Sequence, residues 1–170
     1  MLRYPRGAAA AEDRPLRSFV IVEPFEPIRR SLSRLIERRP GWRVTGEVAS
    51  AEAGMRLAYE TCPDVAIVEL RLGGADALEW ISTLSVVAPD VRTLGYSLRD
   101  DGGSGARFVE AGGHGFVGKE ESPQALLDAI EQALAGKVRV PVRVPAEASP
   151  RPSTVRMPSI IFSSRKRHVL

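Results

Sequence analysis

The chain has 170 residues, of which 44% are hydrophobic and 26% are charged. This length predicts one domain with short additional segments, since domains usually contain about 100–200 residues. The composition excludes a wholly disordered chain, and no apolar run reaches the roughly 18 residues that a membrane-spanning helix needs. The single cysteine, Cys62, excludes an internal disulfide, and together with two distant histidines, His114 and His168, it argues against a zinc site.

The net charge of +3 is distributed unevenly along the chain. Residues 1–17 carry a net charge of +2 and residues 141–170 carry +5, whereas residues 18–140 carry −4. The sequence pI of about 9.4 therefore reflects the ends and is weak evidence that the central part binds nucleic acid. Residues 1–16 lack the long apolar core of a signal peptide, so we expect a flexible leader and a cytoplasmic protein.

Short apolar runs alternate with helical patterns through the central part of the chain. Runs rich in β-branched residues and bounded by Pro or Gly predict five strands. Apolar residues that recur every three or four positions predict a helix after each strand. The predicted strands cover residues 18–22, 42–48, 64–70, 91–97 and 115–118, and the predicted helices lie at 28–36, 51–60, 78–84, 108–109 and 123–134.

Several residues predict where these elements begin, weaken or end. Ser122 is expected to cap the last helix, Pro123 to occupy its first turn, and Gly136 to end it. Gly95 is expected to weaken the fourth strand. Residues 100–105, which are rich in Asp and Gly, predict a flexible loop.

The regular alternation of strand and helix defines the expected fold class. It predicts an α/β domain over residues 17–140, with a parallel sheet and helices on both faces. Right-handed crossovers favour a five-stranded doubly wound sheet with the flavodoxin-like strand order 2-1-3-4-5. In such sheets functional groups gather at the carboxyl ends of the strands. The residues at those ends are Glu23, Pro24, Glu69, Ser97 and Lys119.

The alternating pattern ends at Val140. Residues 141–170 contain five prolines and scattered arginines, which predicts a disordered basic tail, although Ile160–Phe162 could add a strand or dock on the domain. The basic cluster at residues 165–168 could contact nucleic-acid phosphates. No aromatic residues interleave with it and no helix-turn-helix pattern follows Val140, so we do not expect sequence-specific DNA binding.

Two stretches of the chain resemble a known family. Residues 62–71, CPDVAIVELR, resemble the "PDVVLLDIRMP" segment of response regulator receiver domains, and residues 111–119, AGGHGFVGK, resemble the "AGAAGYLLK" segment. The similarity extends over about residues 17–140 and is strongest to the subgroup that carries a helix-turn-helix output domain. It implies a two-component or phosphorelay signalling protein rather than an enzyme, with a histidine kinase or an output protein as partner.

The resemblance also implies roles for the residues at the strand ends. In the family, an aspartate after strand three accepts a phosphoryl group and holds Mg²⁺ together with two acids after strand one. A hydroxyl residue and a lysine bind the phosphoryl oxygens. Glu69 stands at the phosphoacceptor position, Glu23 and Pro24 at the two acidic positions, and Ser97 and Lys119 at the phosphoryl-binding positions.

Two departures from the family pattern predict that this pocket is degenerate. Glu69 is one methylene longer than aspartate, which disturbs the geometry for phosphoryl attack, and Pro24 removes one carboxylate from the Mg²⁺ site, so no metal cofactor is expected. Phe116 matches the aromatic residue that swings inward on activation, although packing in the core is its simpler role. His114 is expected to be a partly exposed loop residue rather than a ligand.

These departures leave three interpretations of the pocket. Glu69 and Lys119 could be a relic that forms an ordinary ion pair at the rim of the sheet. Glu69 could instead be a built-in partial mimic of the activated state, or the chain could still be a phosphorylatable, Mg²⁺-dependent response regulator. We favour a pseudo-receiver that acts through protein contacts on its fourth helix and fifth strand. A further alternative is a regulator that contacts nucleic acid through its basic tail.

Overall fold

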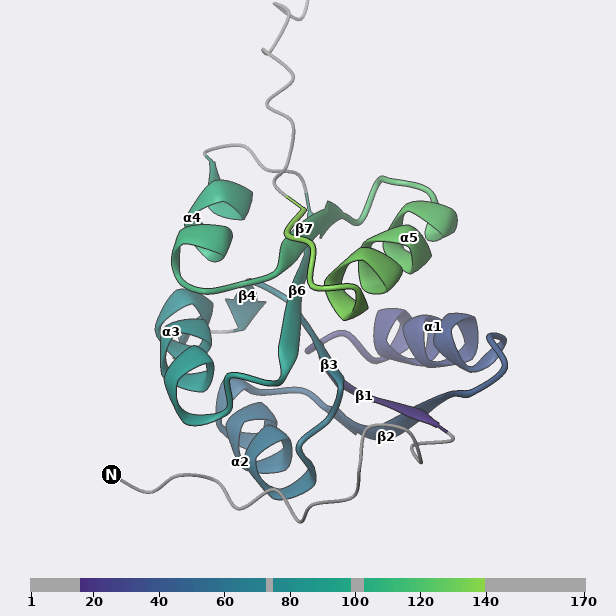
Figure 1. Cartoon of the computed structure of the whole chain (residues 1–170), viewed down its shortest axis with the longest axis horizontal. Helices are drawn as coiled ribbons and strands as arrows, with labels where there is room; N and C mark the ends of the chain where they lie inside the picture. Colours follow the sequence, from purple (N-terminus) through teal and green to yellow (C-terminus); the bar gives the residue numbers. More distant parts are fainter. Residues whose placement is uncertain (1–15, 73–74, 99–102, 140–170) are drawn as a thin grey trace, which may run out of the picture.

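Five parallel strands form a single twisted sheet between two layers of helices (Figure 1). This computed structural model describes residues 16–72, 75–98 and 103–139. The sheet strands are β1 (Arg17–Val22), β2 (Trp42–Val48), β3 (Val65–Val68), β6 (Arg92–Ser97) and β7 (Gly115–Gly118). The helices are α1 (Glu26–Glu37), α2 (Ala51–Thr61), α3 (Ala77–Val87), α4 (Ser104–Glu110) and α5 (Pro123–Leu134).

The strand order is β2-β1-β3-β6-β7, and every neighbouring pair is parallel. Counted along the chain, these five strands have the predicted order 2-1-3-4-5, so the predicted fold class is confirmed. Helices α1 and α5 cover one face of the sheet, and α2, α3 and α4 cover the other (Figure 1). No helix in the described ranges is long and apolar enough to cross a membrane.

The central strand β3 explains why both faces must be covered. All four of its residues are buried. Because successive side chains of a strand point to opposite faces, Val65 and Ile67 pack against α1 and α5, whereas Ala66 and Val68 pack against the layer that contains α3. An uninterrupted apolar run is therefore the sequence that this position requires.

The predicted limits of the last helix are confirmed. The Ser122 hydroxyl accepts a hydrogen bond of 3.2 Å from the backbone N–H of Ala125, and Pro123 occupies the first turn. Gly136 follows the helix with a φ of +75°, a conformation that glycine adopts readily.

Two predictions about local structure need correction, and one element was not foreseen. Strand β3 ends at Val68, two residues earlier than predicted, which places Glu69 outside the strand at the edge of the sheet. Ser104 and Gly105 belong to α4, because Gly103 takes a φ of +79° and starts the helix there. A short antiparallel hairpin, β4 (Arg71–Leu72) with β5 (Ala75–Asp76), was not predicted. The leader up to residue 15 and the tail from residue 140 lie outside the described residues.

Gly95 in β6 has a packing role that its low strand propensity conceals. A Cβ atom at this position would lie 2.9 Å from Cδ2 of Phe116 and 3.0 Å from Cδ1 of Leu70. Real Cβ atoms do not approach so closely, so the missing side chain makes room for the Phe116 ring. Phe116 is accordingly 4% exposed and forms part of the core.

The substitution Gly95→Ala tests this packing. We expect the added methyl group to lower the free energy of unfolding by about 1–3 kcal/mol, the usual cost of overpacking. The double variant Gly95→Ala with Phe116→Leu should recover part of this loss, since leucine leaves more space at the contact. Denaturant unfolding of the three proteins measures both effects, and a Gly95→Ala variant as stable as the wild type would show that the space is not needed.

Candidate functional site: the carboxyl edge of the sheet

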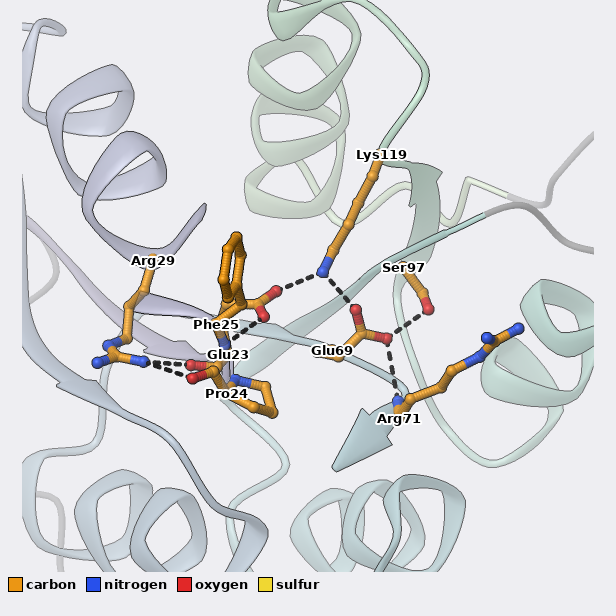
Figure 2. Close-up of polar contacts among 8 residues, drawn as sticks. All are labelled: Glu23, Pro24, Phe25, Arg29, Glu69, Arg71, Ser97 and Lys119. Atoms are coloured by element: carbon orange, nitrogen blue, oxygen red, sulfur yellow. Dashed lines mark hydrogen bonds and ion pairs between the residues drawn. The ribbon is translucent and has the colours of Figure 1, made fainter. Parts of the chain in front are cut away.

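The carboxyl ends of four parallel strands bring four polar side chains together (Figure 2). Glu23 follows β1, Glu69 follows β3, Ser97 ends β6 and Lys119 follows β7. Because these strands are parallel and adjacent, their last residues lie at the same edge of the sheet. The structure therefore brings together the predicted site residues other than Pro24 and Phe116. The side chain of Pro24 is exposed beside the site, and Phe116 is buried in the core.

The ammonium group of Lys119 lies between two carboxylates. Its Nζ atom is 2.5 Å from Oε2 of Glu23 and also contacts Oε2 of Glu69. The side chains of Lys119, Glu23 and Glu69 are only 8%, 4% and 7% exposed. One expectation from the sequence is an ordinary ion pair between Glu69 and Lys119 at the rim of the sheet. The structure corrects it, because the pair is buried and Lys119 is shared with Glu23.

The remaining carboxylate oxygens also have partners. Oε1 of Glu69 accepts hydrogen bonds from the Ser97 hydroxyl and, at 3.0 Å, from the backbone N–H of Arg71. Oε1 of Glu23 accepts a hydrogen bond of 2.8 Å from the backbone N–H of Phe25. All four oxygens are thus satisfied within the protein, which offsets the cost of burying two acids beside one ammonium group.

These contacts determine the ionisation of the site. Burial raises the pKa of Glu69, but the hydrogen bonds from Lys119, Ser97 and the Arg71 amide outweigh it, so that the pKa lies below its ordinary value of 4.5. Burial likewise lowers the pKa of Lys119, but the hydrogen bonds to Glu23 and Glu69 prevail and raise it above 10.5. Glu69 is therefore an anion and Lys119 a cation at neutral pH.

Arg29 was not singled out in the sequence, although it holds the loop between β1 and α1. Its Nη1 atom donates to the backbone carbonyls of Glu23, at 2.5 Å, and of Pro24, at 3.3 Å (Figure 2). Its Nε atom lies 3.8 Å from a carboxylate oxygen of Glu47 on β2. An arginine on the first turns of a helix after such a loop is common, so the sequence alone carried no signal for this role.

Two further predictions concern Phe116 and His114, which lie around the site. Phe116 is buried in the core, as expected, and its ring lies against the position of Gly95. His114 is partly buried and its Nδ1 lies 3.2 Å from the backbone nitrogen of Thr93. Burial and the nearby Arg92 guanidinium lower the pKa of His114, so the imidazole is neutral at pH 7.

The residues at this edge do not fit a Mg²⁺ ion. Mg²⁺ requires near-ideal octahedral oxygen coordination, whereas Pro24 supplies no carboxylate and each of the two remaining acids bonds to Lys119. Within residues 16–72, 75–98 and 103–139, no group of three or more His, Cys, Asp or Glu side chains could hold a metal ion. The ammonium group provides the positive charge of the site instead.

The fold and the strand-end side chains define a doubly wound α/β signalling domain of the receiver class. A family model described as response regulator receiver domain matches residues 19–131. The chain belongs to this family.

Relatives of the chain support the same assignment. A nitrate/nitrite response regulator protein homolog of Haemophilus influenzae is 27% identical over 119 residues, which are 70% of this chain and 57% of that protein. The transcriptional regulatory protein LiaR of Bacillus subtilis is 26% identical over 125 residues, 74% of this chain and 59% of that protein. This chain thus spans just over half the length of the curated relatives that it matches.

Among solved structures, a two-component response regulator of the LuxR family from Aurantimonas is 32% identical. Its structure covers 73% of this chain and 89% of its own, with a TM-score of 0.69. The likeness to this structure therefore extends over most of the chain.

The depressed pKa of Glu69 predicts how stability depends on pH. Glu69→Gln removes the charge, and we expect it to lower the free energy of unfolding at pH 7 by about 1–3 kcal/mol, the range for hydrogen bonds to charged groups. A carboxylate with a lowered pKa stabilises the fold above its unfolded pKa and loses this contribution as the pH falls. The difference between the two proteins should therefore shrink below pH 4.5.

Denaturant unfolding from about pH 3 to about pH 8 measures the difference in unfolding free energy between the wild type and Glu69→Gln. This range spans the ordinary carboxylate pKa. Glu60→Gln is the matched control, since Glu60 is exposed on α2 away from the site. The interpretation fails if Glu69→Gln destabilises the protein equally across the whole range.

Proposed function

We propose that this receiver domain signals through protein contacts without being phosphorylated, and that Glu69 is a fixed negative charge in place of a phosphoryl group. One observation supports this proposal above the others. The Glu69 carboxylate bonds to both Ser97 and Lys119, the two residues at the positions that bind phosphoryl oxygens in the family.

The extra methylene of glutamate supports this role. It places the carboxylate farther from the end of β3 than an aspartate would, toward the hydroxyl of Ser97 and the ammonium of Lys119. A single carboxylate carries less charge and fewer oxygens than a phosphoryl group. The second acid of the site, Glu23, is oriented toward the same Lys119 ammonium and adds to the negative charge.

The position of Phe116 is consistent with an activated-like arrangement. The resemblance implies that the aromatic residue at this position turns inward on activation, and the Phe116 ring is buried. The Phe116 ring can pack inward because Gly95 has no side chain. Its buried position is therefore encoded by residues of the adjacent strands β6 and β7. Ser97, on the same strand as Gly95, is at the same time engaged by Glu69.

The relic interpretation fits the burial less well. An ion pair without a function is easily retained at the surface, because an exposed pair changes the stability of the protein by only about 0–1 kcal/mol. A buried pair requires desolvation of each charge and is retained only with good geometry and additional hydrogen bonds. The Lys119 site has both, through the Ser97 hydroxyl and the amides of Arg71 and Phe25.

The signalling partner would bind near the elements that Glu69 controls. Helix α4 and strand β7 follow Ser97 and precede Lys119 along the chain, and α4 presents exposed side chains at Arg107 and Glu110. We propose this face as the contact surface for a histidine kinase or an output protein. The expectation that the basic tail does not read DNA sequence stays a prediction, because the tail lies outside the described residues.

The loss of the metal site gives a first test. We expect Mg²⁺ to cause no saturable change in tryptophan fluorescence or amide shifts of the wild type through the low millimolar range, because Lys119 occupies the carboxylates. The double variant Pro24→Asp with Glu69→Asp restores the family pattern and should bind Mg²⁺. Saturable binding to the wild type would support the phosphorylatable alternative and overturn the proposal.

A second test asks whether Glu69 sets the state of the switch residues. We expect Glu69→Gln and Lys119→Ala to shift the amide resonances of Phe116 and α4 in the same direction, away from the wild type, because each removes one half of the pair. Lys137→Ala is the control, since Lys137 is exposed beyond α5. Spectra that match the wild type outside the mutated sites would identify Glu69 as a relic.

A further inference from the structure

The segment after α5 returns to the outer edge of the sheet. Beyond Gly136 the chain reverses direction and runs alongside β7, seen as the yellow-green trace in Figure 1. There Arg139 pairs with Gly115 in a parallel bridge, and its backbone N–H donates a hydrogen bond of 3.0 Å to the carbonyl of His114. Strand β7 is an edge strand of the sheet, so this segment covers an edge that would otherwise lie open.

The side chain of Arg139 fastens this segment to the start of α5. Its Nη2 atom lies 2.6 Å from Oε2 of Glu121, and its Nη1 atom donates a hydrogen bond of 2.9 Å to the carbonyl of Ala125. The Arg139 and Glu121 side chains are 27% and 37% exposed, so water reaches the ion pair but does not surround it.

Glu121 connects this contact to the candidate site. Its second oxygen, Oε1, accepts a hydrogen bond of 2.9 Å from the backbone N–H of Gly118, the last residue of β7. The backbone N–H of Glu121 donates in turn to the carbonyl of Gly118, at 3.0 Å. Gly118 directly precedes Lys119, whose ammonium lies between the two buried acids. A single carboxylate therefore joins the end of β7 to Arg139.

The sequence limits how far backbone pairing in this register can extend. In a parallel pair, every second residue of a strand offers its N–H to the same neighbour. After Arg139 the next residue in this register is Pro141, which has no N–H to donate. The side-chain contacts of Arg139 to Glu121 and Ala125 therefore add to the hold of its single backbone bond.

We infer that Arg139 and Glu121 form a latch that fixes the exit of the chain to the edge of β7, and that the Lys119 site controls its hold through Gly118. When Lys119 is held between Glu23 and Glu69, the end of β7 is fixed and presents its N–H to Glu121. When Lys119 is released, the Gly118–Glu121 turn loosens and Arg139 loses its partner. The latch thus couples the state of the site to the hold on Arg139. This inference does not depend on Glu69 acting as a phosphoryl mimic.

Limited trypsin digestion of the full chain tests the latch. Trypsin must extract the Arg139 side chain and detach its backbone from β7 before it cleaves after this residue. We expect Glu121→Gln to accelerate this cleavage by about two- to fivefold, the effect of losing one half-exposed ion pair. Glutamine keeps an acceptor for the Gly118 amide, so the substitution isolates the contact to Arg139. Glu120→Gln is the matched control, since Glu120 is its exposed neighbour.

Cleavage after Arg56 requires helix α2 to unfold and serves as the internal reference in each digest, because α2 is not among the elements that Glu69 is proposed to control. We expect Glu69→Gln to raise the ratio of Arg139 to Arg56 cleavage, as Glu121→Gln does, because it weakens the hold on Lys119. Equal rates for Glu121→Gln and Glu120→Gln would show that there is no latch. An unchanged ratio in Glu69→Gln would show that the site does not control it, and either result overturns the inference.

Discussion

The structure of the site depends on one ammonium group held between two buried carboxylates. Lys119 reaches from the end of β7 to the acids that follow β1 and β3, so one charge joins three strands of the sheet at their common edge. In a receiver with the full acidic set, that edge binds a divalent cation. Here the lysine that the family also carries bonds directly to both remaining acids.

Pro24 and Glu69, the two departures from the family pattern, can be explained together. Without a second acid at Pro24, a metal ion would lack coordination, and the charge of Glu23 would be left poorly balanced. The longer side chain at Glu69 lets the acid that follows β3 reach Lys119 directly, and Glu23 reaches the same ammonium. Arg29 then holds the loop that carries Pro24 through its carbonyls. The substitutions therefore support one another rather than accumulate as independent losses.

Most of the fold was predictable because its signals are local. The buried run at β3 and the Ser122 cap each depend on a few consecutive residues. The burial of Lys119 and the role of Arg139 depend on residues that are distant in the sequence, where no local pattern exists. Arg29 bonds to carbonyls only five and six residues away, but its residue type and position do not predict those bonds. The packing role of Gly95 likewise depends on Phe116, which lies on the neighbouring strand. The resemblance to receivers located the site residues, but it could not show how their charges are paired.

The fully satisfied Glu69 carboxylate has a consequence for regulation. A phosphorylated receiver is active for as long as its modification lasts, so its output follows the balance between a kinase and hydrolysis. A charge that is part of the polypeptide has no lifetime separate from that of the protein. Under the proposed function, the amount of active regulator equals the amount synthesised and not yet degraded. Gene expression and proteolysis, on a timescale of minutes to hours, would then take the place of phosphate transfer as the control of this signal.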